Sequence, residues 1–242
     1  MKSIGVILAR LDSRRLPLKA FMEVSGRPLI SYAVDRALRL PSLSAVIVAT
    51  STRPVDDALV EYGRKAGVAV FRGSADNVAE RCSECAKEHG ADFFVRLNAD
   101  SPFPDQDLIE SGLQLIRRQG APDLVTNLIG RTFPYGISVE IVNVATMGRI
   151  LPTLDADEAE HVTKRFYDRP AEFLIRQLVS PKPELRPARL AVDTAEDLAI
   201  LGAIVQRLGP RVLEARYDEV ATLYMSESKV PSSIESAGFA RP

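Results

Sequence analysis

The chain has 242 residues, of which 46% are hydrophobic and 26% charged, and its 31 Lys and Arg against 32 Asp and Glu give a formal net charge of −1. This is the composition of a globular protein with one large domain or two small ones. The balanced charge argues against a general nucleic-acid-binding function, because such proteins neutralise phosphates with an excess of Lys and Arg.

The charge is unevenly distributed along the chain. Residues 1–40 contain eight Lys and Arg against three Asp and Glu, a net +5, which leaves −6 on the other 202 residues. A cationic N-terminal segment on an anionic remainder indicates a local site for an anionic ligand.

The cysteine content and the lengths of the apolar runs indicate the cellular compartment of the protein. Cys82 and Cys85 are too few for an extracellular disulfide framework, so we expect a reducing cytoplasm. The apolar run 4–9 is too short, and too basic downstream, for a signal peptide. Since no run approaches the ~20 apolar residues of a membrane span, the sequence predicts a cytoplasmic protein with no membrane partner.

The first half of the sequence predicts four successive strand–helix units. The expected strands are residues 4–9, 45–49, 68–71 and 92–97, and the expected helices are 28–40, 52–66, 76–89 and 105–119. Strands that are apolar throughout are buried on both faces, which is typical of a parallel sheet covered by helices. We therefore expect an α/β fold with a doubly wound, mostly parallel sheet.

The second half of the sequence is less regular. Its expected strands are residues 124–127, 137–142, 173–176 and 189–192. Its expected helices are 145–151, 157–168 and one that begins after a cap at Asp193 or Thr194.

The loop after the first expected strand is strongly basic, and ligands of open α/β sheets bind beyond the carboxyl ends of strands. It has neither the glycine pattern of dinucleotide folds nor that of a P-loop. Guanidinium groups bind phosphate oxygens in pairs and an ammonium acts as a point charge, so the loop is a candidate polyphosphate site; a solvated basic loop is the alternative. Its polar members are Arg10, Ser13, Arg14, Arg15 and Lys19.

The loop after the fourth expected strand carries a carboxylate. Asp100 lies three residues beyond that strand, where it is a natural ligand for Mg²⁺ that bridges substrate phosphates. A role in capping the turn before Pro102 is the alternative. Together with the basic loop, Asp100 predicts the two halves of a nucleotide site.

Several segments match one enzyme family in order and spacing. The basic loop reads Ala9-Arg-Leu-x-Ser-x-Arg-Leu-Pro-x-Lys19, and the match covers about residues 4–205. Over this length the chain resembles the cytidylyltransferase family that contains CMP-Kdo synthetase and acylneuraminate cytidylyltransferase, nearest its spore coat polysaccharide branch, SpsF. The resemblance implies a nucleotide-diphospho-sugar transferase fold, which is GT-A-like and Rossmann-like. Further matching segments are 48–51, 56–57, 71–74, 95–102, 126–127, 131–136, 139–140, 160–163 and 192–197.

The resemblance also implies an activity and a set of site residues. The activity is Mg²⁺-dependent transfer of CMP from CTP to a sugar hydroxyl, usually that of an acidic sugar for a surface polysaccharide, with release of pyrophosphate. The implied nucleotide-binding residues are Ala9, Arg10, Ser13, Arg15, Lys19, Arg72, Ser74 and Arg81. Asp100 and Asp193 are implied at the metal, and Tyr135, Glu140 and His161 at the acceptor. The expected catalytic residues are Arg10, Lys19 and Asp100.

The same comparison predicts one domain. We expect it to span residues 1–225, with a nucleotide-binding half at about 1–120 and an acceptor and dimerisation half at about 121–225, followed by a mobile tail at 226–242. The expected assembly is a homodimer.

Departures from the family pattern leave two other functions open. Asp12 and Leu18 stand where the family usually carries Gly or another small residue, and Asn98-Ala99 replaces a more usual Thr/Gly pair, which indicates a different nucleotide or acceptor. One alternative is glycosyl transfer from a nucleotide sugar, since related folds also use a strand-end carboxylate and a metal. The other is a non-catalytic protein that binds a nucleotide or a sugar.

The pattern Cys82-x-x-Cys85-x-x-x-His89 has the spacing of zinc ligands. It lies on one expected helix and lacks an obvious fourth ligand, which favours two partly buried thiols on a core-facing helix.

Overall fold

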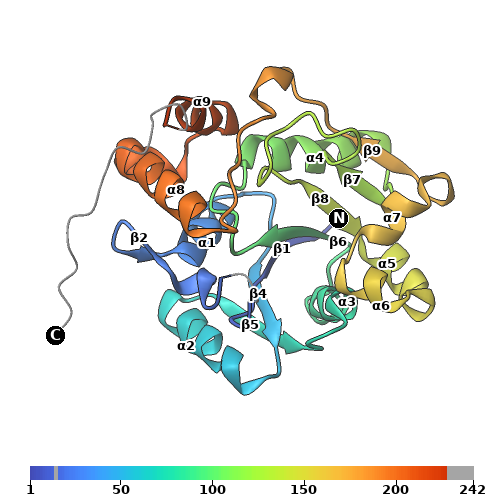
Figure 1. Ribbon diagram of the computed structural model, residues 1–242. Helices are drawn as coiled ribbons and strands as arrows, with labels where there is room; N and C mark the ends of the chain where they lie inside the picture. Colours follow the sequence, from blue (N-terminus) through green and yellow to red (C-terminus); the bar gives the residue numbers. More distant parts are fainter. Residues whose placement is uncertain (14–15, 228–242) are drawn as a thin grey trace.

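A seven-stranded sheet forms the centre of the computed structural model, which describes residues 1–13 and 16–227 (Figure 1). Its strand order is β5-β4-β1-β6-β8-β7-β9, and every neighbouring pair is parallel except the two made by β8. The strands are β1 Ser3–Leu8, β4 Val46–Ser51, β5 Ala69–Gly73, β6 Phe93–Asn98, β7 Leu124–Thr126, β8 Glu140–Asn143 and β9 Ile175–Gln177.

Helices cover both faces of this sheet (Figure 1). The α-helices are α1 Leu29–Leu38, α2 Asp57–Ala66, α3 Val78–Glu88, α4 Gln106–Gln119, α5 Val144–Ile150, α6 Ala156–Glu160, α7 Lys164–Asp168, α8 Ala195–Leu208 and α9 Tyr217–Glu227. Short 3-10 helices are η1 Lys19–Phe21, η2 Pro54–Asp56, η3 Leu151–Thr153, η4 Pro170–Glu172, η5 Pro183–Leu185 and η6 Gly209–Leu213, and β2 Glu23–Val24 pairs with β3 Arg27–Pro28 in a hairpin. Within the described residues, no helix combines the length and the apolar character needed to cross a membrane.

Alternation along the central strands divides the core into two layers. In β1, Ile7 packs with α1, α2 and α4 on one face, whereas Ile4 and Val6 pack with α3 and α5 on the other. Because successive side chains of a strand point to opposite faces, a strand covered on both sides must be apolar throughout. The doubly wound, mostly parallel α/β fold expected from the sequence is thereby confirmed.

The strand order places a crevice beside β1. From β1 the chain moves outward to β4 and β5 on one side and then crosses over, through α3, to β6 on the other side of β1. Ligands of open α/β sheets bind at such a reversal of strand order, beyond the carboxyl ends of the strands.

The C-terminal half departs from the expected elements in three places. The expected helix 157–168 is two helices, because the backbone turns at the fully buried Val162, whose φ is +25°. Residues 189–192 form only a single bridge, between Arg189 and Tyr135. Helix α9 was not expected; residues 226–227 of the expected tail complete it, and 228–242 lie outside the described residues.

Buried polar contacts fasten the C-terminal helices to the sheet layer. The Arg36 guanidinium is 1% exposed and donates hydrogen bonds to the carbonyl oxygens of Pro104, Val212 and Ala215 at 2.6–3.0 Å. Burial lowers the pKa of Arg36 to about 10, so the guanidinium stays charged at neutral pH. Val212 and Ala215 lie between α8 and α9, so Arg36 holds this connecting segment against α1.

Gly136 is a glycine that the tertiary structure requires. Its φ is +95°, and a Cβ built there would lie 2.4 Å from the carbonyl carbon of Leu190. The two backbones are this close because the loop that contains Tyr135 pairs with the loop that contains Leu190. The Leu190 amide donates to the Tyr135 carbonyl oxygen at 2.6 Å.

We expect Gly136→Ala to lower the free energy of unfolding by about 3 kcal/mol or more, since it adds a backbone clash to an unfavourable positive φ. Urea denaturation measures this loss. The control is Gly130→Ala, whose φ is +54° but whose Cβ would meet nothing within 4 Å, and which should cost only about 1 kcal/mol. Equal losses in the two variants would contradict the argument from close approach.

Candidate active site

A pocket of about 470 Å³ lies beyond the carboxyl ends of β1 and β6. Leu8 comes from β1, and Arg96 and Asn98 come from β6. The other side chains come from loops, from η1, and from α3 and α6. Its polar lining residues are Arg10, Ser13, Lys19, Arg81, Arg96, Asn98, Asp100, Tyr135, Glu160, His161 and Asp193.

Lys19 joins the basic loop to two carboxylates. Its Nζ lies 2.5 Å from Oδ2 of Asp100 and 3.6 Å from Oδ1 of Asp193. All three side chains are largely buried, with 12–28% of their surface exposed. The two acidic residues expected at the metal therefore converge on one point of the pocket.

Backbone pairing brings Asp193 to this point from a distant part of the chain. The Val192 amide donates a hydrogen bond to the carbonyl oxygen of Asp100 at 2.9 Å. The Tyr135 hydroxyl donates to Oδ2 of Asp193 at 3.0 Å, and the guanidinium of Arg189 stacks over the Tyr135 ring at 4.8 Å. Tyr135, Asp100 and Asp193 thus form one wall of the pocket.

The acidic pair fits a magnesium ion. Mg²⁺ prefers one or two carboxylates together with substrate phosphates and water, and Asp100 and Asp193 already direct oxygens at a common cation, the Lys19 ammonium. Among the described residues there is no cluster of three or more His, Cys, Asp and Glu side chains that could hold a metal by itself. A metal at this place therefore depends on oxygens from a bound ligand.

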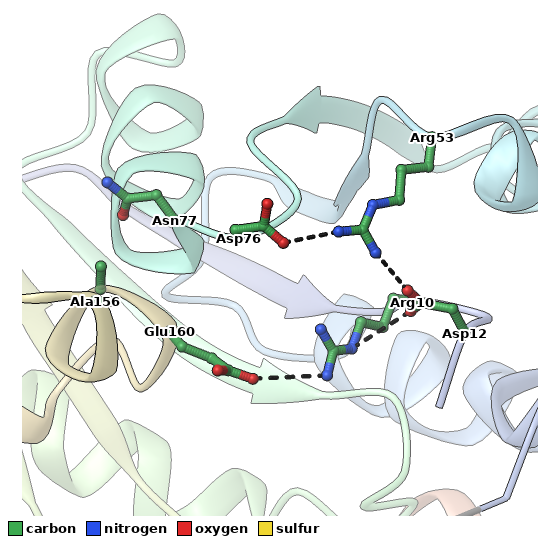
Figure 2. A pocket seen from close by; sticks show the side chains of 8 residues that line it. Arg10, Asp12, Arg53, Asp76, Asn77, Ala156 and Glu160 are labelled. Carbon is green, nitrogen blue, oxygen red and sulfur yellow. Dashed lines mark hydrogen bonds and ion pairs between the residues drawn. The ribbon is translucent and has the colours of Figure 1, made fainter. Parts of the chain in front are cut away.

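A second hollow, of about 410 Å³, continues the pocket past Arg10 (Figure 2). Arg10 and Glu160 line both spaces. In Figure 2, the Asp12 carboxylate lies between two guanidinium groups, with Arg53 Nη1 at 2.6 Å and Arg10 Nε at 3.5 Å. Arg10 Nη2 also lies 3.7 Å from Glu160 of α6.

Arg96 forms part of the pocket floor and is held from behind by Glu140. The two residues belong to the paired strands β6 and β8, and Arg96 Nη1 donates to Glu140 Oε2 at 2.5 Å. The hydroxyls of Thr163 and Tyr167 donate to Glu140 Oε1 at 2.5 and 2.7 Å. Burial acts to raise the pKa of Glu140, but Arg96 and these hydrogen bonds outweigh it, and the pKa lies below its ordinary value.

Glu140 therefore lies behind the pocket and not on its surface. It is 1% exposed, and its expected role at the acceptor would have to act through Arg96. His161, by contrast, lines the pocket, with 61% of its side chain exposed and Nε2 3.4 Å from Asp157.

Arg81 is a buried guanidinium at the same floor. Its exposure is 2%, and Nη1 donates to the carbonyl oxygen of Ser74 at 2.6 Å. The Nε atoms of Arg81 and Arg96 are buried without a hydrogen-bond partner among the described residues. Burial lowers the pKa of Arg81. Two such groups make the floor of the pocket favourable for an anion.

Of the other residues expected to bind the nucleotide, some line the pocket and some do not. Ala9 and Ser13 line it directly. Arg72 and Ser74 do not: Arg72 donates to the carbonyl oxygens of Ser51 and Arg53 at 3.0 and 3.1 Å, and Ser74 Oγ accepts from the Asn77 amide at the start of α3. Arg15 lies outside the described residues.

Leu18 adopts a left-handed backbone conformation, which fits a position where the family usually carries glycine. Its φ is +60° and its ψ is 16°, in the left-handed region that favours glycine, and its side chain is 52% exposed. Leu18 is not among the side chains that line the pocket, so its bulk does not fill that space.

The thiols of Cys82 and Cys85 lie on the core-facing side of α3, as expected, but are more deeply buried than expected. Both are free and fully buried among the apolar residues under α3. Burial raises the pKa of the Cys82 thiol to about 11 and that of Cys85 to about 12, so both stay protonated at neutral pH.

Three charged residues that line the two pockets were given no role by the sequence reasoning: Arg53, Arg96 and Glu160. Arg96 lies on a strand whose other residues are mostly apolar, and a charged side chain there is a usable signal. Glu160 begins a segment that matches the family, 160–163, but the resemblance assigned a role only to His161 there. Arg53 lies outside the matching segments, and nothing in the sequence distinguishes it from a solvated charge.

Comparison with known proteins gives the family to which this fold and pocket belong. The cytidylyltransferase family model matches residues 4–199, so the chain belongs to the cytidylyltransferase family. It is 30% identical to the spore coat polysaccharide biosynthesis protein SpsF of Bacillus subtilis (strain 168) over 213 residues, which are 85% of this chain and 87% of SpsF.

One solved structure agrees with this membership, and a second, more distant one shows the fold alone. The structure of a cytidylyltransferase from Leptospira borgpetersenii matches with a TM-score of 0.88 and 26% identity over 94% of this chain and 95% of that one. A CMP:2-keto-3-deoxy-manno-octonic acid synthetase complexed with CTP matches with a TM-score of 0.66 and 18% identity, over 86% of this chain and 99% of that one, which shows a shared fold.

We expect Glu140→Gln to lower the free energy of unfolding at pH 7 by about 3 kcal/mol, because it leaves the buried Arg96 charge without its partner. Since the pKa of Glu140 is lower in the folded protein, its contribution is present above an ordinary carboxyl pKa and is lost as the pH falls through the folded value. The variant should therefore lose less stability than wild type between pH 5 and pH 3, or thereabouts. Denaturation curves across this range measure both effects.

The matched control is Glu61→Gln, which removes a carboxylate that pairs with Arg64 on the exposed face of α2. It should change stability by less than about 1 kcal/mol. A Glu140→Gln protein as stable as this control would show that the buried pair contributes nothing.

Proposed function

We propose that this chain transfers CMP from CTP to a hydroxyl group of a sugar, most simply an acidic sugar destined for a surface polysaccharide, and releases pyrophosphate. The observation that carries the proposal is the convergence of Lys19 with Asp100 and Asp193, beside Arg10, at the carboxyl ends of β1 and β6. Family membership supports the use of CTP, and the similarity to SpsF supports a polysaccharide precursor as the acceptor.

The reaction requires positioning and charge neutralisation more than covalent help from the protein. The acceptor oxygen forms a bond to the α-phosphorus, and the bond from that phosphorus to the oxygen bridging to the β-phosphate breaks. Pyrophosphate leaves, and the hydroxyl proton passes to a nearby base or to water. Arg10 and Lys19 would face the phosphate oxygens, and their charge would offset the negative charge that develops on the leaving group.

Asp100 and Asp193 would hold Mg²⁺, which supplies further positive charge against the phosphates when it is bound. In the structure these carboxylates contact the Lys19 ammonium. For Mg²⁺ to bind, Lys19 must leave them and turn to the phosphates. The floor of the pocket, with the buried guanidinium groups of Arg81 and Arg96, supports an anionic substrate.

The acceptor would approach from the side of Tyr135 and His161, both of which line the pocket. Glu140 would act here as the residue that fixes Arg96. We further propose the division into a nucleotide half, about 1–120, and an acceptor half, about 121–225; the continuation of one sheet from β6 into β8, β7 and β9 supports a single domain.

A homodimer and a cytoplasmic location are also proposals. The exposed side chains of Leu174 and Val179 flank β9, the last strand at that edge of the sheet, and would suit the pairing of a second copy. The two free cysteines are consistent with a reducing compartment.

The proposed reaction is tested by incubating the protein with Mg²⁺, each nucleoside triphosphate and a series of sugar acids and neutral sugars, and measuring pyrophosphate. We expect release with CTP, and Asp100→Asn should lower the turnover by ~100-fold or more because the metal loses a ligand. The matched control Asp107→Asn, in which an exposed aspartate of α4 is changed, should keep full turnover. Full turnover by Asp100→Asn would contradict the metal assignment, and CTP binding without pyrophosphate from any acceptor would favour a non-catalytic protein.

The phosphate role of Lys19 is tested by calorimetry. We expect Lys19→Ala to weaken CTP binding by about 10-fold to 100-fold at low salt, the usual range for a lost charge-assisted hydrogen bond. Lys65→Ala, on the exposed last turn of α2, is the control and should bind as wild type does. Unchanged affinity of Lys19→Ala at low salt would refute the role.

A further inference from the structure

The Asp12 carboxylate lies in the loop that is to receive a triphosphate. Its side chain is 30% exposed, and the loop bounds both the main pocket and its extension past Arg10. A carboxylate without compensation at this place would repel an incoming polyphosphate, and partial burial strengthens that repulsion relative to bulk water.

Arg53 supplies the compensation. Its Nη1 donates to Asp12 Oδ2 at 2.6 Å, which is a charge-assisted hydrogen bond, whereas the ion pairs of Arg10 with Asp12 and Glu160 are longer, at 3.5 and 3.7 Å (Figure 2). The lengths indicate that Arg53, more than Arg10, is committed to Asp12. The second partner of Arg53 is Asp76, whose side chain is 90% exposed, and exposed ion pairs contribute little.

The backbone around Arg53 is fixed independently of Asp12. The Arg53 amide donates to Ser51 Oγ at 3.1 Å, and its carbonyl oxygen accepts from Arg72. The Asp56 carboxylate, which is 1% exposed, accepts from the Leu11 amide at 2.8 Å and so ties this loop to the basic loop. The frame therefore presents Arg53 to Asp12 and does not need the ion pair to hold the loops together.

We propose that Arg53 is a positioning residue for nucleotide binding, which holds and neutralises Asp12 so that the Arg10 guanidinium is available to the triphosphate. The inference rests on the proposed use of CTP and assigns to Asp12 and Arg53 a joint role in the affinity for it. Its consequence is a coupling: Arg53 matters for the nucleotide only as long as residue 12 carries a negative charge.

A double-mutant cycle tests this coupling. CTP binding is measured by calorimetry, without acceptor, for wild type, Arg53→Gln, Asp12→Asn and the double variant. We expect Arg53→Gln to weaken binding by ~10-fold at low salt, and less at high salt because exposed charges are screened. Asp12→Asn should bind at least as tightly as wild type, and adding Arg53→Gln to it should change the affinity by less than about 2-fold.

Rescue of Arg53→Gln by Asp12→Asn is a result that a merely structural role of Arg53 does not produce. The matched control is Arg64→Gln, an exposed arginine of α2 that should leave the affinity unchanged. An equal loss from Arg53→Gln with and without Asp12→Asn, or no loss at all, would overturn the proposal. A folded wild-type protein that binds no CTP would instead overturn the proposed function, and the inference with it.

Discussion

The parallel pairing of β1 with β6 is the constraint on which the rest of the site depends. Six residues of each strand are in register, from Ser3 opposite Phe93 to Leu8 opposite Asn98, so both strands end side by side. The basic loop follows one strand and Asp100 follows the other. Cations and carboxylates far apart in the sequence therefore meet at one edge of the sheet, beside the reversal of strand order where α/β folds bind ligands.

The charged side chains of the site form ion pairs with one another, and several of them are also suited to bind a nucleotide or a metal ion. Lys19 contacts the two carboxylates that fit a metal, and Arg10, which suits phosphate, lies near Asp12 and Glu160. Pairing stabilises these charges in a partly buried pocket, where an isolated charge would be costly. A nucleotide and its cation would then exchange partners with groups already in place, so little reorganisation of the backbone is needed.

Buried arginines hold separate parts of the molecule together, and one of them, Arg96, lines the pocket. Arg36 donates to three carbonyl oxygens and holds the C-terminal helices in place, and Arg96 is fixed by Glu140 on the neighbouring strand. The Arg96–Glu140 contact couples the floor of the pocket to the second half of the sheet. Substitutions in β8 or α7, which carry none of the pocket-lining side chains, thus have a physical route to the site.

The sequence by itself determined the alternating strands and helices of the first half, and with them the places of Lys19 and Asp100, because apolar runs show where strands end. Asp193 was reachable only through family resemblance, since its approach to Asp100 depends on a loop pairing of residues 188–192 that carries no periodic signal. The partnership of Arg53 with Asp12, and the burial of Glu140 behind the pocket, were decided by the tertiary structure alone. The physical reason is that an ion pair between distant residues forms only where the sheet brings their loops together. The local pattern of apolar and polar residues in the sequence indicates only which side chains are buried and which face water.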